Sequence, residues 1–207
     1  SPKARTTKRA APKTKLDKQF ERLRAWTKTG KVEDDGFWRA SAEAFIKQIP
    51  DYAAHGVRAF TLCLQGGHCG YEGPVNSAYN PDGSLRESYL ARVRTVIEAC
   101  DREGVAVILG CYYQREDQIL KDEAAVRAGV VNAARWIKDQ GFTNVALEIA
   151  NEFHHGGFNH PLIKTPQGEA EPIALAKKTT PGLLVSTSGL GGGVAFFLGV
   201  VEGLSEQ

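Results

Sequence analysis

The segment NVALEIANE, residues 144–152, is an apolar run that ends in an asparagine and a glutamate. Its apolar and β-branched residues predict a buried strand over residues 144–150, followed directly by Asn151 and Glu152. Side chains alternate between the two faces of a strand, so Glu148 shares one face with Glu152 and the apolar residues share the other. We expect the apolar face to pack under helices. Glu152 then lies at the end of the strand, with Glu148 deeper on the same face.

Strands of this kind recur along the chain and alternate with amphipathic helices. Strands are expected over residues 57–64, 105–113, 144–150 and 183–188. Helices are expected up to about Gly56, from a capping box at Ser84–Glu87 to about Gly104, and over residues 122–140, with a short helix in the Pro-containing stretch before the last strand. Near-continuous apolar strands separated by such helices indicate a parallel sheet that helices cover.

Polar side chains gather at or just beyond the C-terminal ends of these strands. They are Gln65 and His68, then Tyr112, Tyr113, Gln114 and Asp117, then Asn151, Glu152, His154 and His155, and last Ser186 and Ser188. A barrel places its chemistry along that one rim, whereas a doubly wound sheet concentrates it at one switch point. No GxGxxG or P-loop pattern follows any of the strands. The sequence therefore predicts an α/β fold, a partial (β/α)8 barrel.

Glu152 is the best-placed candidate for catalysis. A rim carboxyl beside Phe153 and the neighbouring tyrosines can be held in its protonated form and act as a general acid. The amide of Asn151 is suited to binding a sugar hydroxyl. Further substrate contacts are expected from Gln65, His68, Tyr113, Gln114, His154 and His155. Alternation places one of Tyr112 and Tyr113 in the core and the other in the cleft, and it does not say which.

The histidines also allow a metal-site hypothesis. Imidazole ligands are available from His68, His154, His155 and His160. However, adjacent histidines at a strand end point apart, and the chain has no HxH or HExxH pattern. We therefore expect neither a metal nor a cofactor, and a metal-dependent barrel hydrolase is kept as an alternative function.

The segment LEIANE, residues 147–152, resembles the fourth-strand Asn-Glu signature of clan A glycoside hydrolases, and of the cellulase-like family five in particular. The resemblance extends over residues 40–193, as strands two to five of that barrel. Segments 64–67, 76–79, 82–85 and 183–188 are also similar to an uncharacterised cellulase-like branch. The resemblance implies retaining O-glycosyl hydrolysis of a β-linked carbohydrate, with Glu152 as acid/base and Asn151 on the 2-hydroxyl. It also implies a nucleophilic glutamate on a seventh strand.

The chain departs from that family in several places. Many cellulases have an arginine where this chain has residues 62–65, and a proline where it has Phe153. The chain ends soon after the expected fifth strand, so we expect a truncated barrel without its nucleophile, inactive as it stands. Glu202 lies in the tail, where nothing places it opposite Glu152. A non-catalytic remnant that binds carbohydrate or a partner through the same rim is the main alternative.

Composition and charge are those of an ordinary soluble domain, with 42% apolar and 24% charged residues in a chain of 207. We expect a basic disordered leader over residues 1–18, the barrel-like domain over 19–193, and an atypical tail over 194–207. The leader has seven Lys or Arg against one Asp, but no interleaved aromatic residues, so a solvated leader is favoured over a nucleic-acid contact. No membrane span or signal peptide is visible and the chain has no Met, so the cellular compartment stays open.

Several residues are expected to have structural roles. Cys63, Cys100 and Cys111 suit buried positions, and Cys63 could pair with Cys69 only if the turn between them allows it. We expect Glu148 to be a buried structural acid, with Arg58 as a candidate partner. Trp26, Trp38 and Trp136 are expected to pack rather than to bind sugar. Unpaired sheet edges at the first and last strands predict self-association.

Overall fold

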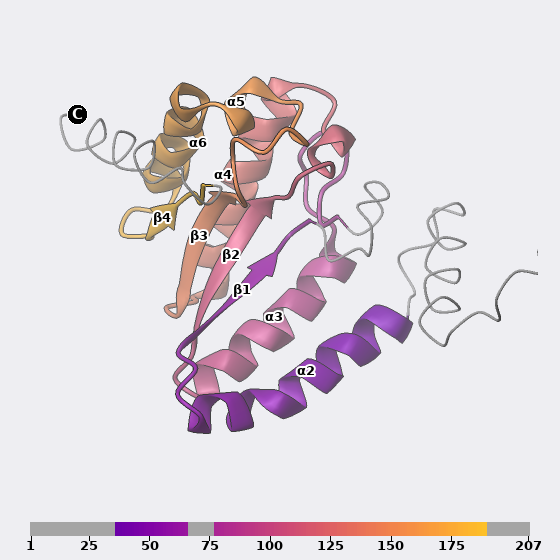
Figure 1. Ribbon diagram of the computed structural model, residues 1–207, viewed down its shortest axis with the longest axis vertical. Coiled ribbons are helices and arrows are strands. Elements are labelled where there is room, and N and C mark those ends of the chain that lie inside the picture. Colours follow the sequence, from indigo (N-terminus) through magenta and orange to yellow (C-terminus); the bar gives the residue numbers. More distant parts are fainter. Residues whose placement is uncertain (1–35, 66–76, 190–207) are drawn as a thin grey trace, which may run out of the picture.

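The computed structural model describes residues 36–65 and 77–189, which form one parallel sheet with its helices (Figure 1). The elements are α2 (Gly36–Ala54), β1 (Ala59–Cys63), α3 (Glu87–Arg102), β2 (Ala106–Tyr112), a 3-10 turn η1 (Asp117–Ile119), α4 (Glu123–Gln140), β3 (Val145–Ala150), α5 (Pro161–Lys164), α6 (Pro166–Thr179) and β4 (Val185–Ser186). The expected leader and tail, His68, Cys69 and Trp26 lie outside the described residues. None of the helices in the described ranges has the length and apolar character that a membrane span requires.

The four strands are all parallel and lie in the order in which they occur in the chain, β1-β2-β3-β4. The helices lie on one side of this sheet, and no described helix covers its other face (Figure 1). A doubly wound sheet would have helices on both faces and a point where the strand order reverses. Sequential order with helices on one face is the arrangement of a (β/α)8 barrel segment. The predicted fold is confirmed, and the sheet formed by the described strands is open.

The two faces of the sheet follow the predicted alternation. Phe60 of β1 packs edge-on against Phe45 and Tyr52 of α2, with ring centroids 5.0 and 5.6 Å apart, which identifies the helix-covered face. Val107 and Val145 are in register with Phe60 on that face and are buried. The opposite face is left uncovered by the described helices, and β1 is exposed there at Ala59 and Thr61.

Glu148 lies on the uncovered face, in register with Gly110 of β2 and, through it, with Cys63 of β1. A methyl group added at Gly110 would lie 3.3 Å from Glu148 Oε2 and 3.2 Å from Cys63 Sγ, so this glycine makes room for both side chains. The suggested pairing with Arg58 is wrong. Arg58 donates to the carbonyls of Ala53 and of its own neighbour Val57, because it precedes β1 at the opposite end of the sheet.

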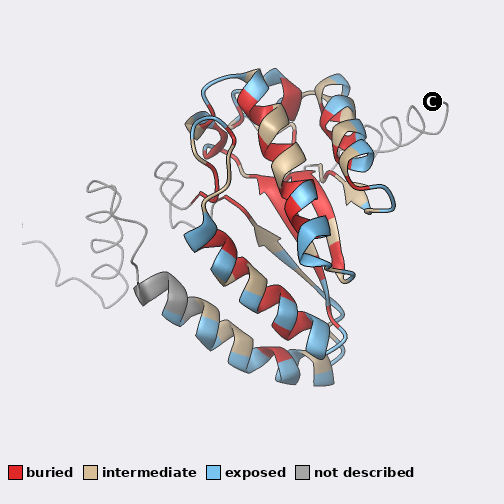
Figure 2. Cartoon of the chain, turned by 180° about the vertical axis from the view of Figure 1, so that it is seen from behind, coloured by how far each residue is buried: buried red, intermediate tan, exposed pale blue. Residues whose placement is uncertain are grey.

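The boundaries of α4 show how the sequence sets a helix. Asp122 caps the helix by accepting from Ala125 N at 2.8 Å, and Gly141 ends it with φ 70°, a left-handed conformation that suits glycine. Trp136 is buried near its end and packs against Phe142, as expected. In the view from behind, α3 and α4 turn exposed residues outward and buried residues toward the sheet (Figure 2). The helix predicted over residues 122–140 is confirmed.

The predicted capping box at Ser84–Glu87 is wrong. α3 begins at Glu87 with Arg86 as its N-cap, and no side chain caps it. The Ser84 hydroxyl instead donates to Asp82 Oδ1 at 2.6 Å and accepts from Asn80 Nδ2 at 2.9 Å. Asp82 lies only two residues before Ser84, so the Ser84 hydroxyl bonds within this local turn and does not cap the helix.

The stretch between β3 and β4 forms more helix than predicted. The four-residue α5 is followed directly by the fourteen-residue α6, and each begins with a proline at its first position. Thr165 separates the two helices and caps α6 by accepting from Gly168 N at 3.0 Å. The two prolines fit because the first turn of a helix has no use for the missing N–H.

The remaining structural expectations concern the cysteines and the sheet edges. Cys100 and Cys111 are buried and Cys63 is half-buried, and all three are free thiols. Within the described ranges, β1 and β4 each have a single neighbouring strand. Self-association through these edges stays a prediction.

Candidate functional site

The carboxyl ends of the four strands meet at one edge of the sheet, and polar residues from each strand end lie along it. Gln65 follows β1, Gln114 follows β2, Asn151 and Glu152 follow β3, and Ser188 follows β4. Because neighbouring parallel strands end side by side, residues far apart in the sequence become neighbours here. We call this edge the rim.

Glu152 is held from both sides at the rim. On the β4 side, its backbone N–H donates to Ser188 Oγ at 3.0 Å, and the next N–H, of Phe153, donates to Ser188 O at 2.9 Å. On the β2 side, Glu152 Oε2 accepts from Gln114 Nε2 at 2.6 Å. The backbone and the carboxylate are therefore fixed by separate strands, which gives a half-buried carboxyl one defined orientation.

Gln114 joins the two residues of the Asn-Glu pair. Its side-chain amide is buried, with 1% of the residue exposed, and Nε2 also lies 3.3 Å from Asn151 Oδ1. Its Oε1 is buried and has no hydrogen-bond partner within the described residues. Asn151 is itself anchored by its backbone, which donates to Tyr112 O at 3.1 Å. The Nε2 atom of Gln114 is therefore directed at both Asn151 and Glu152.

Backbone strain marks the same place. In the described part of the chain, Arg115 and Glu152 are the non-glycine residues with positive φ, at 64° and 54°. A left-handed conformation costs a residue with a side chain about 1–2 kcal/mol, and such residues concentrate at functional sites. Arg115 directly follows Gln114, so one strained residue takes part in the contact between Gln114 and Glu152 and the other lies next to it.

Gln65 and Tyr112, by contrast, serve the frame beneath the rim. Gln65 is fully buried and accepts at Oε1 from Tyr113 N, while its Nε2 donates to Ser77 Oγ at 3.2 Å and to Glu116 O at 3.0 Å. The hydroxyl of Tyr112 donates to Val126 O of α4 at 2.6 Å. Tyr112 is thus the tyrosine that packs, and Tyr113 is left half-buried at the strand end. Gln65 has both amide hydrogens engaged, so we leave it out of the proposed substrate contacts.

The two adjacent histidines have different surroundings. The ring of His154 packs edge-on against Phe153 at 4.8 Å between centroids, whereas His155 Nδ1 accepts from Gly157 N at 2.9 Å. Both residues are half-buried. Over residues 36–65 and 77–189, no three His, Cys, Asp or Glu side chains are grouped so that they could hold a metal ion.

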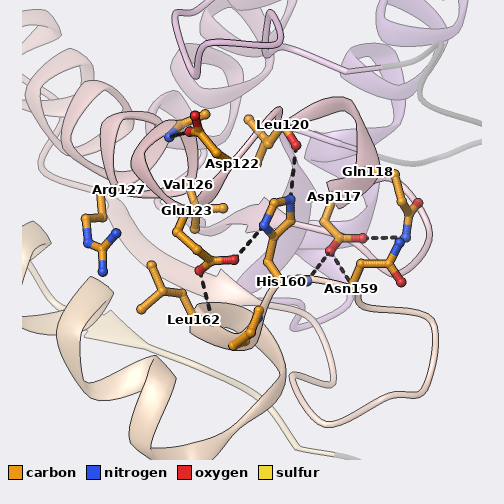
Figure 3. A network of polar contacts seen from close by, with 12 residues as sticks. Asp117, Gln118, Leu120, Asp122, Glu123, Val126, Arg127, Asn159, His160 and Leu162 are labelled. Carbon is orange, nitrogen blue, oxygen red and sulfur yellow. Dashed lines mark hydrogen bonds and ion pairs between the residues drawn. The ribbon is translucent and has the colours of Figure 1, made fainter.

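A network that sequence reasoning missed fixes the segment after Glu152 (Figure 3). Asp117 Oδ2 accepts from the backbone N–H groups of Asn159 and His160, at 2.8 and 3.1 Å. The His160 ring lies between Glu123 Oε1, 2.7 Å from Nδ1, and Leu120 O, 3.1 Å from Nε2. Both ring nitrogens of His160 are therefore engaged in holding the β3–α5 loop against the start of α4. The sequence signal was Asp117 itself, a polar residue just beyond a strand end.

Three further carboxyl groups are buried near the rim. Burial raises the pKa of Glu148, which the Ser188 hydroxyl opposes, and burial together with Asp117 raises the pKa of Glu116 to about 8. Burial also raises the pKa of Glu169 on α6 well above its usual value. Glu169 could have been found from the sequence, since it shares helical spacing with the buried residues Ile173 and Ala176. Glu116 follows a strand end beside Asp117, which is a weaker signal.

Comparison with known proteins adds little to this geometry. No family model and no curated protein matches the chain. Among solved structures, the chain is similar to one described as a glycoside hydrolase, with 14% sequence identity and a TM-score of 0.47. The match covers 71% of this chain and 47% of that one, so this chain spans about half the length of the matched structure. A likeness at that TM-score carries no argument about function, and the proposed function rests on the contacts of the rim.

Proposed function

We propose that the protein carries the acid/base half of a retaining glycoside hydrolase site for a β-linked carbohydrate, with Glu152 as the acid/base. The observation that carries the proposal is the 2.6 Å contact in which the buried Gln114 amide orients the Glu152 carboxylate at the rim. A proton donor must be held in one direction toward the bond that breaks, and Glu152 meets that need because one strand end fixes its backbone and another fixes its carboxylate.

In the proposed reaction, Glu152 gives its proton to the glycosidic oxygen as the bond between that oxygen and the sugar carbon breaks. The bonding electrons leave with the oxygen, and a second carboxylate attacks the sugar carbon to form a covalent intermediate. Glu152, now ionised, then takes a proton from the water that hydrolyses the intermediate. The second carboxylate must lie about 5–5.5 Å from Glu152. The family resemblance implies that this second carboxylate lies on a seventh strand.

Substrate contacts are proposed for the residues that border Glu152. Asn151 is the proposed ligand of the sugar 2-hydroxyl, because its Oδ1 accepts from Gln114 and its amide hydrogens are directed away from that contact. Tyr113, His154 and His155 are half-buried residues of the β2 and β3 ends and are proposed to line the same cleft. His68 belongs to the proposal from sequence, and it lies outside the described residues.

A panel of aryl β-glycosides tests the proposal on the full-length protein. Glu152→Gln keeps the shape of the side chain and removes its acidic proton. We expect kcat/KM for phenyl glycosides, which have poor leaving groups, to fall about 10²–10⁴-fold. Glu98→Gln, at an exposed position on α3, is the matched control and should retain wild-type rates. Equal rates for wild type and Glu152→Gln would refute the assigned role. Saturable oligosaccharide binding without turnover of any glycoside would support the non-catalytic carbohydrate-binding alternative instead.

A further inference from the structure

The amide of Gln114 faces two atoms that accept hydrogen bonds, Glu152 Oε2 and Asn151 Oδ1. From this we infer that Gln114 is a positioning residue that decides which oxygen of Glu152 carries the transferable proton. The inference rests on the proposed function, in which Glu152 is the acid/base. Gln114 was expected to bind substrate, and this role replaces that expectation.

The orientation of the Gln114 amide follows from its partners. An amide nitrogen carries two hydrogens and the amide oxygen carries none, so only Nε2 can donate to the Glu152 carboxylate. With the amide reversed, its oxygen would face the ionised Glu152 oxygen at 2.6 Å, lone pair against lone pair. The orientation with Nε2 toward Glu152 and Asn151 is therefore the one that Gln114 keeps while Glu152 is ionised.

The position of the proton on Glu152 follows from the same contact. The carbonyl oxygen of a carboxylic acid accepts hydrogen bonds better than its hydroxyl oxygen does, so the 2.6 Å bond from Gln114 Nε2 favours Oε2 as the carbonyl oxygen. The acid form of Glu152 therefore carries its proton on Oε1, and Oε2 remains the acceptor. In the reaction the proton passes from Oε1 to the leaving oxygen and is later replaced on Oε1 from water, while Oε2 stays bonded to Gln114.

Gln114 also sets the polarity of Asn151. Because Asn151 Oδ1 accepts from Gln114, the donor end of the Asn151 amide is left for the substrate. Burial makes both assignments firm, since Gln114 is 1% exposed and water does not compete for its donors. One buried amide thus gives the rim a proton donor at Glu152 Oε1 and an N–H donor at Asn151.

The chain offers a matched control in Gln118. Its Nε2 also joins the β2–α4 loop to the segment after Glu152, by donating to Gly157 O at 3.0 Å, and it donates to Asp117 Oδ1 at 2.7 Å. Gln118 is exposed and does not contact Glu152. A variant that loses the hydrogen bonds of Gln118 therefore tests the link between the two loops without affecting the Glu152 carboxylate.

The experiment compares Gln114→Met and Gln118→Met in the full-length protein, since Met keeps the length of Gln and lacks its donors. For Gln114→Met we expect kcat/KM to fall about 10–100-fold on phenyl β-glycosides and less than about threefold on dinitrophenyl β-glycosides, whose departure needs no acid. For Gln118→Met both substrates should stay within about threefold of wild type. An equal loss on both substrates for Gln114→Met, or the same pattern for Gln118→Met, would overturn the inference.

A second readout does not depend on activity. In the proton–nitrogen spectrum, the side-chain amide of Gln114 is identified by its absence from Gln114→Met. We expect one of its protons to resonate downfield, to exchange slowly with water, and to lose both properties in Glu152→Ala. If that signal is unchanged in Glu152→Ala, the inference fails even where Glu152 proves catalytic. If the signal responds but Glu152→Gln hydrolyses glycosides normally, the contact stands and the proposed function fails.

Discussion

The two ends of β3 each carry an asparagine, and the two amides are used in opposite ways. At the amino end, Asn144 Nδ2 donates to the carbonyls of Ile97 and Val105, both at 3.2 Å, and ties neighbouring segments together. At the carboxyl end, Asn151 accepts from Gln114, and no residue in the described ranges accepts from its Nδ2. The first asparagine completes the fold, while the second is oriented by its neighbours and left with donors to offer.

The turns at the amino ends of the strands, here called the amino edge, also differ from the turns at their carboxyl ends, the carboxyl edge. At the amino edge, glycines such as Gly104 and Gly141 adopt the left-handed conformation, and they do so without strain. At the carboxyl edge, Arg115 and Glu152 adopt it with side chains. The buried acids with raised pKa values also lie toward this edge. The amino edge is built for stability, and the carboxyl edge keeps costly features of the kind that functional sites retain.

Replacing each asparagine by alanine should show the difference between the two ends of β3 most clearly. We expect Asn151→Ala to lower kcat/KM for aryl β-glycosides about 10²–10³-fold, because hydrogen bonds to the 2-hydroxyl strengthen in the transition state. Asn144→Ala should instead leave kcat/KM unchanged and lower the free energy of unfolding by about 1–3 kcal/mol, since two buried carbonyls lose their donor. Steady-state kinetics and urea unfolding of both variants measure this. Equal catalytic losses in the two variants would remove the distinction.

The buried acids at the carboxyl edge make the stability of the fold depend on pH. Glu116 ionises near its ordinary pKa of 4.5 in the unfolded chain and near 8 in the folded one. Between those values the unfolded state gains from ionisation and the folded state does not, so stability falls as the pH rises from about 4.5 to about 8. Glu116→Gln removes this loss, and we expect it to be more stable than wild type at pH 8 by on the order of 2–4 kcal/mol.

Urea unfolding at pH 5 and pH 8 measures the effect, and Glu98→Gln on the exposed face of α3 is the control. The advantage of Glu116→Gln should shrink toward zero as the pH falls to about 4.5. The free energy of unfolding of Glu116→Gln should still change with pH, because burial raises the pKa of Asp117, Glu148 and Glu169 as well. A difference that is the same at both pH values would contradict a raised pKa at Glu116.

The smallest effect concerns the turns themselves. A methyl group added at Gly141 meets no atom within 4 Å, so Gly141→Ala tests the left-handed backbone alone and should cost about 1 kcal/mol. Glu152→Gly relieves the same strain but loses the Gln114 contact, so its net change should stay within about 1 kcal/mol of zero. Thermal unfolding should therefore show a Tm about 2–4 °C lower for Gly141→Ala and nearly unchanged for Glu152→Gly. A large fall in Tm for Glu152→Gly would mean that Glu152 stabilises the fold.

Local pattern was enough to predict the parts of the fold that local forces decide. Apolar runs and helical spacing located β2, β3 and α4, and alternation placed Glu148 on the face opposite Leu147. The capping box failed because Asp82 competes for Ser84 over a distance of two residues, and a pattern of four letters does not contain that competitor.

The candidate site was predictable only as a set of residues at strand ends. The sequence does not show that Gln114 donates to Glu152. It also does not show that the Gln65 amide donates to the Ser77 hydroxyl and to the carbonyl of Glu116. Those contacts join residues up to 51 positions apart, and they depend on how the sheet brings strand ends together. The Asp117–His160–Glu123 network was missed for the same reason.

The most direct test of the account is chemical rescue of Glu152→Ala in the full-length protein. With the carboxyl removed, a dinitrophenyl β-glycoside can still form the covalent intermediate, and azide, which needs no general base, can enter the space that Glu152 leaves. We predict that azide accelerates turnover and that the product is a glycosyl azide of retained β configuration, identified by proton NMR. An α-glycosyl azide, or turnover that azide does not accelerate and that yields only free sugar, would contradict the role of Glu152 as the acid/base of a retaining site.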